Sequence, residues 1–168
     1  MPWHTLNAGE VLRLVRDNRE HLRQWEPRRD AAYFTLAGQR ALLAQAAAEH
    51  ARGTEDICGV RDLDARLVGR VALTGIERGP FRSCHLGYFI DHRFSGRGHA
   101  TAAVRLMLRR AFDELGLHRV EAACMPANLA SIRVLRKCGF RTEGLARSYL
   151  CINGVWEDHR RFAVTATR

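Results

Sequence analysis

The spacing of apolar residues predicts two amphipathic helices in the first third of the chain. Between residues 11 and 25, apolar side chains recur at helical intervals with arginines between them, and Pro27 ends the pattern. Thr35 is a residue type that caps helices, and the segment after it keeps helical spacing until Gly53 supplies a stop. We therefore expect one helix on each side of Pro27.

The pattern then changes to that of strands. Short apolar runs cover residues 57 to 60, 67 to 76 and 84 to 90, and turn-forming residues separate them. This predicts three antiparallel strands.

In the last third of the chain, apolar residues alternate between helical spacing and strand spacing. Residues 104 to 115 form one helical stripe that Gly116 ends, a strand follows over 118 to 124, and a further helix runs from residue 126 to Gly139. Residues 141 to 152 and 155 to 165 form a hairpin around Asn-Gly, the favoured two-residue turn. The predicted order of elements is ααβββαβαββ.

Length and composition suit a single domain covering residues 1 to 168. The chain is 46% apolar, enough for one sizeable core, and no repeat or linker interrupts it. No segment approaches the roughly 20 apolar residues of a membrane-spanning helix, and the start lacks the basic and apolar regions of a signal peptide. We expect a cytoplasmic protein that does not contact a membrane.

The cysteines and the charged residues limit the kinds of ligand that we expect the chain to bind. Five cysteines stand singly, without the close pairs of zinc or redox sites, so we expect reduced structural thiols and no bound metal. The 27 basic and 18 acidic residues give a formal net charge of +9, which attracts anionic groups such as phosphates, RNA or acidic peptides. No recognised nucleic-acid motif accompanies this charge, so direct nucleic-acid binding is not expected.

A glycine-rich segment lies between a predicted strand and an amphipathic helix. At a helix start, several backbone N–H groups have no internal partner, and glycines let a pyrophosphate approach them closely. The segment lacks the Gly-Lys-Ser/Thr ending of a Walker loop and the three spaced glycines of a dinucleotide-binding loop. We expect a diphosphate cradle here, with a plain strand-to-helix turn as the alternative. The segment is Arg93-Phe94-Ser95-Gly96-Arg97-Gly98-His99-Ala100.

A second segment contains Asn128, Ser131, Lys137, Gly139 and Phe140. Taken alone, the asparagine is a good helix cap and the glycine a helix stop, so a purely structural role would account for both. The segment gains meaning only in combination with the cradle.

Taken together, the two segments resemble the GNAT superfamily of acyl-CoA-dependent N-acetyltransferases. Within it, the chain is similar to the bacterial ribosomal-protein N-terminal acetyltransferases, and the resemblance covers nearly the whole sequence. The motifs that carry it are Leu86-Gly87-Tyr88, the Arg-x-x-Gly-x-Gly pattern of residues 93 to 98, Asn128-x-x-Ser131, Lys137-x-Gly139-Phe140, Glu143-Gly144 and Asn153-Gly154-x-Trp156-x-Asp158-His159.

This resemblance implies an α/β (α+β) fold and a cosubstrate. The fold has a mixed, mostly antiparallel sheet flanked by about four helices, and the strands ending at Ile90 and Cys124 splay apart. The implied cosubstrate is acetyl-CoA, whose pantetheine arm would enter the gap and pair with the backbone of Phe89 and Ile90 while its phosphates lie on the cradle. Asn128 would hold the pantetheine or thioester end, Ser131 would lie near the sulfur, and Lys137 would meet a phosphate.

Amide formation by direct attack requires an uncharged amine and a proton for the leaving thiolate. By resemblance, Ser131 is the candidate acid, or at least a hydrogen-bond donor to the thiolate. Many superfamily members carry a glutamate where this chain has His85, and others carry one before the last hairpin, where this chain has none. The candidates for the base are therefore His85, then Glu143, then Tyr149 as a proton relay, with a plain solvent-facing histidine as the alternative for the first.

The expected acceptor is the N-terminal amine of a protein such as a ribosomal protein, because the group that the sequence resembles acts there. RNA would then be met only indirectly, through the ribosome. The alternatives are a small amine of the antibiotic or polyamine type, and a noncatalytic CoA-binding or RNA-associated module. The positive charge of the chain disfavours polyamines.

The N-terminus departs from the pattern of these relatives, which usually have a strand before the first helix. Only residues 1 to 7 precede the helix here, so that strand is expected to be missing or very short. Its absence would expose a sheet edge, which a second copy of the chain in a homodimer would cover.

Overall fold

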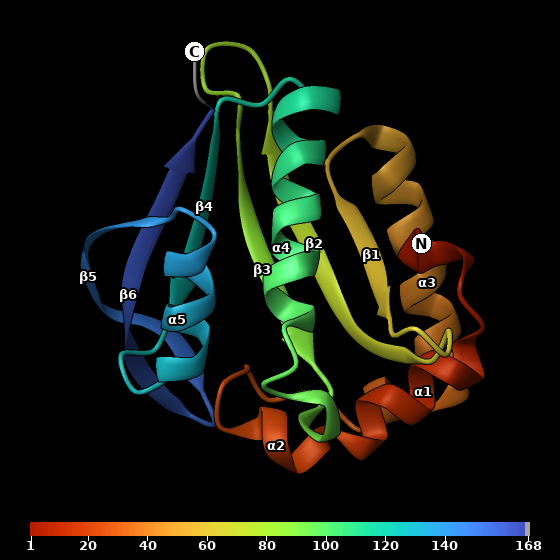
Figure 1. Cartoon of the computed structure of the whole chain (residues 1–168). Coiled ribbons are helices and arrows are strands. Elements are labelled where there is room, and N and C mark those ends of the chain that lie inside the picture. Colours follow the sequence, from red (N-terminus) through yellow and green to blue (C-terminus); the bar gives the residue numbers. More distant parts are fainter. Residues whose placement is uncertain (167–168) are drawn as a thin grey trace.

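A computed structural model describes residues 1 to 166 and contains one six-stranded sheet with helices on both faces (Figure 1). The strands lie in the order β1-β2-β3-β4-β6-β5, and only β3 and β4 pair in parallel. The mixed, mostly antiparallel sheet is therefore confirmed. The strand bounds are β1 Asp56–Arg61, β2 Leu67–Glu77, β3 Ser83–Ile90, β4 Arg119–Cys124, β5 Arg141–Ile152 and β6 Val155–Thr165.

α3 begins and ends at the residues that the sequence indicates. Thr35 Oγ1 accepts a hydrogen bond from Gly38 N–H at the start of α3, and Gly53 ends that helix in the left-handed conformation. The helix expected over residues 104 to 115 starts earlier, at His99, and its last turn, Arg110–Glu114, is a π-helix. The α-helices are α1 Ala8–Asp17, α2 Arg19–Arg23, α3 Leu36–Arg52, α4 His99–Arg109 and α5 Leu129–Lys137.

The first predicted helix is in fact two helices. Asn18 separates α1 from α2 and leaves helical geometry at φ −103° and ψ 4°. Its fully buried side chain donates to Leu14 O and accepts a hydrogen bond from His92 N–H at 2.9 Å. The side chain of an asparagine competes with the helix backbone in this way, and the spacing of apolar residues does not register it. The break joins the N-terminal helices to the loop after β3.

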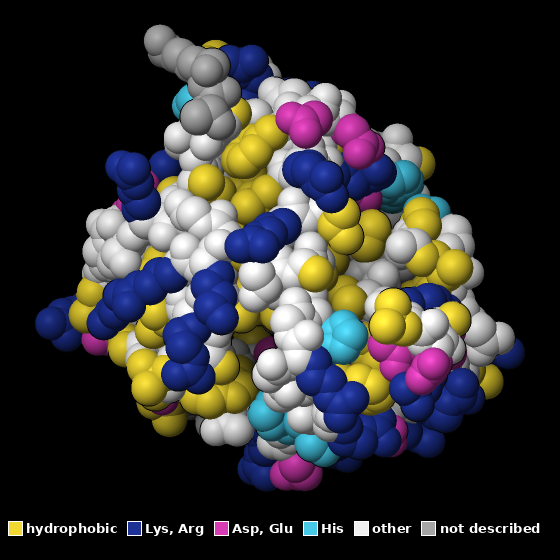
Figure 2. Space-filling model, viewed as in Figure 1, with side chains coloured by type: hydrophobic (Ala, Val, Ile, Leu, Met, Phe, Trp, Pro, Cys, Tyr) yellow, Lys and Arg dark blue, Asp and Glu magenta, His cyan; other side chains and the backbone are white. Residues whose placement is uncertain are grey.

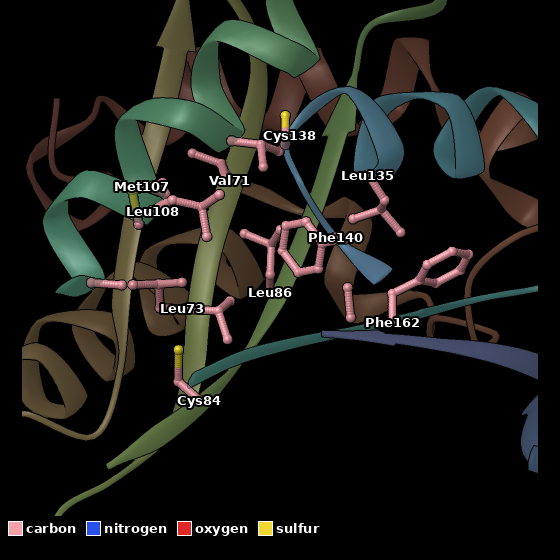
Figure 3. Packing of buried hydrophobic residues seen from close by; sticks show 14 of the residues in the cluster. Val71, Leu73, Cys84, Leu86, Met107, Leu108, Leu135, Cys138, Phe140 and Phe162 are labelled. Carbon is pink, nitrogen blue, oxygen red and sulfur yellow. The ribbon is translucent and has the colours of Figure 1, made fainter. Parts of the chain in front are cut away.

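The core consists of two apolar clusters on opposite faces of the sheet. One lies between the sheet and α4 and α5, and Figure 3 shows Leu73, Leu86, Met107 and Phe162 converging in it. The other lies between β1, β2 and β3 and the helices α1 and α3. The helices thus fix the position of the sheet from both sides, and no helix in residues 1 to 166 is long and apolar enough to cross a bilayer.

The N-terminal strand that the sequence predicts to be missing or very short is reduced to two backbone contacts with β1. Pro2 forms an isolated bridge with Cys58, and Gly59 N–H donates to Met1 O at 2.9 Å. Residues Trp3–Thr5 then form a 3-10 turn that leads into α1. A short extended segment therefore covers part of the β1 edge.

The five cysteines are free thiols in the structure. Burial raises the pKa of the Cys84 thiol to about 12, and it also raises the pKa of Cys124 and Cys138. Their thiolate forms are scarce at neutral pH, so these side chains are poor nucleophiles. This agrees with the structural role expected for them.

Candidate functional site

A cleft opens where the two parallel strands separate. β3 and β4 pair only between Ser83–His85 and Arg119–Glu121, and from Leu86 and Ala122 onward they have no register partner on each other. The splay expected of these strands is therefore confirmed. The cleft has a volume of about 920 Å³ and is lined by the diverging strands, the start of α4, α5, the α2 segment and the last hairpin.

The glycine-rich loop forms one end of this cleft. Gly96 and Gly98 both have positive φ, at 77° and 87°, and a Cβ atom on either would meet no atom of the chain within 4 Å. The first hydrogen bond of α4 runs from Ala102 N–H to Gly98 O, so the preceding N–H groups are left for another acceptor. The space and the free donors suit a pyrophosphate at the helix start.

Ion pairs of Arg93 with the buried Asp91 and the half-exposed Asp17 hold this loop in place. The Arg93 guanidinium donates to both carboxylate oxygens of Asp91 and, at 2.8 Å, to Asp17 at the end of α1. Burial opposes ionisation of Asp91, but the hydrogen bonds from Arg93 outweigh it and keep the pKa of this carboxyl below its usual value. Because its guanidinium binds both Asp91 and Asp17, Arg93 connects the loop to the end of α1.

The start of α5 forms the wall next to the gap between the strands. Asn128 Oδ1 accepts a hydrogen bond from Ser131 N–H at 3.0 Å and caps the helix. Ser131 Oγ lies 2.9 Å from Tyr88 Oη on β3. Burial raises the pKa of the Cys124 thiol on β4, and a hydrogen bond with Ser131 opposes the shift. Ser131 thus stands between the two diverging strands.

A buried histidine lies on the other side of the gap. Arg160 pairs with Cys124, so the neighbouring His159 projects from the opposite face of the sheet, because successive side chains of a strand alternate. His159 is 4% exposed, and its Nδ1 donates to Glu157 O at 3.1 Å, which leaves Nε2 free to accept a proton. Its ring lies against that of Tyr149, with 5.3 Å between centroids.

The cleft brings together most of the residues that the sequence singled out. Two proposed base residues are elsewhere: His85 lies on the paired part of β3, beside Glu121, and Glu143 is bound by Arg119 at that same end. Arg93 and Arg97 do not line the cleft either, and the Arg97 guanidinium lies over the ring of Phe94. The predicted residues that do line it are Phe89, Ile90, Phe94, Ser95, Gly96, Gly98, His99, Ala100, Asn128, Ser131, Lys137 and Tyr149.

Sequence reasoning missed His159 and Glu26. His159 belongs to one of the recognised motifs, but only the fold shows that its ring is buried against Tyr149 and lines the cleft. Glu26 lies in the segment after α2 and is the one carboxylate among the residues that line the cleft. The motif that contains His159 does not indicate that its ring lines a cleft, and Glu26 stands in no recognised motif.

The electrostatic character of the site is basic. Arg133 and Lys137 on α5 line the cleft on the same side as the loop. Figure 2 shows Lys and Arg side chains gathered over the lower half of the face that carries α4 and α5, with histidines among them. No group of three or more His, Cys, Asp or Glu side chains within residues 1 to 166 could hold a metal ion. The cleft therefore favours an anionic, phosphate-bearing ligand.

Known proteins share this arrangement. Residues 2–141 match the family model described as an acetyltransferase (GNAT) domain. A probable N-acetyltransferase of Bacillus subtilis, YjcK, is 42% identical over 97% of this chain and 91% of its own length. The ribosomal-protein-S5-alanine acetyltransferase of Vibrio fischeri superposes with a TM-score of 0.91 at 36% identity, over 95% of this chain and 87% of that one. Mycobacterium smegmatis RimJ, solved in complex with CoA-disulfide, superposes with a TM-score of 0.90 at 33% identity, over 95% of this chain and 78% of that one.

Proposed function

Because the chain belongs to the GNAT acetyltransferase family, we propose that it transfers the acetyl group of acetyl-CoA to the N-terminal amine of a protein. The observation that supports this most is the cleft itself, which joins the glycine-rich loop at the start of α4 to the gap between β3 and β4. The proposed acceptor is supported by the V. fischeri relative, which is named a ribosomal-protein-S5-alanine acetyltransferase.

The cosubstrate supplies an acetyl group activated as a thioester, and the residues of the cleft fit it. The free N–H groups at the start of α4 would hold the diphosphate, and Lys137 and Arg133 would meet further phosphate charge. The unpaired edge of β3 at Phe89 and Ile90 would hydrogen-bond the pantetheine amides. Asn128 and Ser131 would lie at the thioester end.

The chain's own groups would then manage two protons. His159 Nε2 would take one from the incoming ammonium, so that the neutral nitrogen can form its bond to the acetyl carbon. As the carbon–sulfur bond breaks, the nitrogen loses its second proton, and the departing thiolate takes up one proton to leave as CoA thiol. Ser131, held by Tyr88, would donate a hydrogen bond to the departing sulfur from the other face. Tyr149 beside His159 would relay the collected proton to solvent.

An assay of acceptors tests the proposed function. Purified protein would be given acetyl-CoA with Ala- and Ser-starting peptides, the same peptides already N-acetylated, and small amines including spermidine, and released thiol would be measured. We expect turnover of the free peptides and none of the blocked ones. Turnover of small amines alone would replace the proposal with a small-molecule acetyltransferase. Thiol release without any acceptor would mean hydrolysis and would also contradict it.

Replacing Asn128 with alanine should weaken the use of acetyl-CoA. The variant loses the α5 cap, which lowers the free energy of unfolding by about 1 kcal/mol. It should also raise the KM for acetyl-CoA several-fold, because the first turn of α5 and its serine are no longer held. Steady-state kinetics and thermal unfolding would measure the two effects.

Asn7→Ala is the matched control for that variant. Asn7 caps α1 by accepting from Gly9 and Glu10 N–H, and it does not line the cleft. A similar loss of stability without a change in KM is expected. An equal KM change in both variants would mean that Asn128 acts only through stability.

A homodimer is the remaining part of the proposal for partners. The bridge between Pro2 and Cys58 covers part of the β1 edge and leaves the rest of that edge for a second copy. Sedimentation of the purified protein at micromolar concentration would decide between one copy and two.

A further inference from the structure

Beside the cleft lies a smaller pocket of about 300 Å³ with a strongly basic wall. Four arginines line it, namely Arg19, Arg23, Arg28 and Arg29, together with a single carboxylate, Glu26. A pocket of this composition favours a ligand that carries negative charge.

The arginines of this pocket are only partly neutralised. Arg29 lies 3.6 Å from Glu26 and Arg23 lies 3.8 Å from Glu20, while Arg19 and Arg28 make no ion pair within residues 1 to 166. The Arg19 guanidinium lies 4.4 Å from the ring centroid of Phe34, which holds the cation in place without cancelling its charge. Positioned guanidinium groups without partners are suited to bind carboxylates.

A fifth arginine, Arg70 on the sheet, adds positive charge next to this pocket. Arg70 on β2 is partly buried, its enclosed Nε has no hydrogen-bond partner in the described part of the chain, and its guanidinium lies 5.7 Å from the ring centroid of Trp3. Burial lowers the pKa of this guanidinium, and the charged or ionisable neighbours that it senses include Tyr33, Glu26 and Arg29, which line the pocket. The sheet thus places an uncompensated donor group next to the arginine pocket.

The arginine pocket adjoins the place where the acceptor amine must arrive. It shares Leu22, Glu26, Pro27 and Arg29 with the lining of the cleft. The last hairpin closes it, because Asn153 at the hairpin turn donates to Arg23 O. An extended chain spans about 3.3 to 3.6 Å per residue, so a peptide with its amine in the cleft would pass the shared wall within a few residues.

We infer that this arginine pocket binds acidic side chains just after the first residue of the acceptor, so that the favoured substrates are peptides with Asp or Glu among positions 2 to 5. The inference rests on the proposed function and adds its substrate class. The acceptor's ammonium group would pass beside Glu26, while its carboxylates would lie on Arg19 and Arg28. The opposite charges along the acceptor would then match those of the wall.

Matched peptides test the inference. Two peptides start with alanine and differ only in having Asp-Glu or the isosteric Asn-Gln at positions 2 and 3, and kcat/KM is measured for each. We expect the acidic peptide to be favoured by roughly five- to tenfold, the size typical of a few partly exposed charge contacts. The preference should shrink as the salt concentration rises.

Variants locate the preference in the pocket. Arg19→Gln and Arg28→Gln should each reduce it several-fold and leave turnover of the amide peptide unchanged. Arg109→Gln, which removes an equal charge at the exposed end of α4, should retain it. Thermal unfolding would verify that all three variants are folded.

The outcomes separate the two proposals. Equal kcat/KM for the acidic and amide peptides would overturn the inference and leave the proposed function standing. Free aspartate and glutamate used as acceptors in place of either peptide would overturn the commitment to a peptide. If no peptide is acetylated, the proposed function fails, and the inference fails with it.

Discussion

Replacing Gly98 with valine should abolish the binding of acetyl-CoA, raising its Kd at least about 100-fold, because strain and obstruction act on the same site. Gly98 has a φ of 87°, which a β-branched residue rarely adopts, and its side-chain position faces open space in the cradle. A valine would either occupy the space meant for the diphosphate or turn the first N–H groups of α4 away from it. Calorimetric titration with acetyl-CoA would measure the loss.

Gly116→Val provides the matched control. Gly116 also has positive φ, at 64°, and open space around its side-chain position, but it follows the π-helical turn far from the cleft. It should lose comparable stability and keep its affinity for acetyl-CoA. If the folded Gly98→Val variant binds acetyl-CoA with unchanged affinity, the glycine-rich loop does not bind the diphosphate.

Replacing His159 with glutamine should lower kcat for a peptide acceptor by about 100- to 1000-fold, the range typical of a missing general base. Glutamine keeps a polar group of similar length but cannot take up the proton of the ammonium. The KM for acetyl-CoA should change little, since the side chain projects from the opposite face of the sheet to Cys124 and Ser131. Single-turnover kinetics would isolate the chemical step.

The pH dependence distinguishes a base from a packing residue. An N-terminal amine has an ordinary pKa of about 7.7 to 8.0, so above this range the acceptor arrives already uncharged. The ratio of wild-type to variant kcat should therefore be large at pH 6.5 and fall at least about tenfold by pH 9, as the need for a base disappears. A ratio that stays constant with pH would mean that His159 only supports the wall of the cleft.

His85→Gln is the informative comparison, because the sequence ranked His85 first. Its ring lies on the paired part of β3 and does not line the cleft, so we expect little change in kcat. A large loss in His85→Gln with normal activity in His159→Gln would restore the order suggested by the sequence.

Much of the fold follows from local patterns in the sequence. The hairpin around Asn153 and Gly154 and the cap at Thr35 are set by residue types whose conformational preferences act within a few positions. The break at Asn18 is harder to predict, because its side chain combines a local bond to Leu14 O with a bond from His92 N–H, 74 positions along the chain. The helical spacing of apolar residues continues through this position in the sequence, although the helix is interrupted there in the folded chain.

The same distinction applies to the site. The cradle is a contiguous segment, so its position between a strand and a helix was predictable from the chain alone. The proposed acceptor side of the cleft is built from α2, the segment after it and the last hairpin, which lie more than 100 residues apart in sequence. Which histidine faces the gap depends on the pairing of β4 with β6, and residue types do not reveal that register.

The contacts at the end of α1 have one further consequence. Asn18 binds the backbone of His92, and Asp17 binds Arg93, so this joint connects the wall proposed to receive the acceptor to the loop proposed to receive the diphosphate. If filling the loop steadies this joint, the acceptor meets a wall that is already ordered and binds more tightly. Thermodynamic reciprocity then requires that the acceptor strengthen the hold on acetyl-CoA by the same factor. The two substrates would be coupled through a joint that neither of them touches.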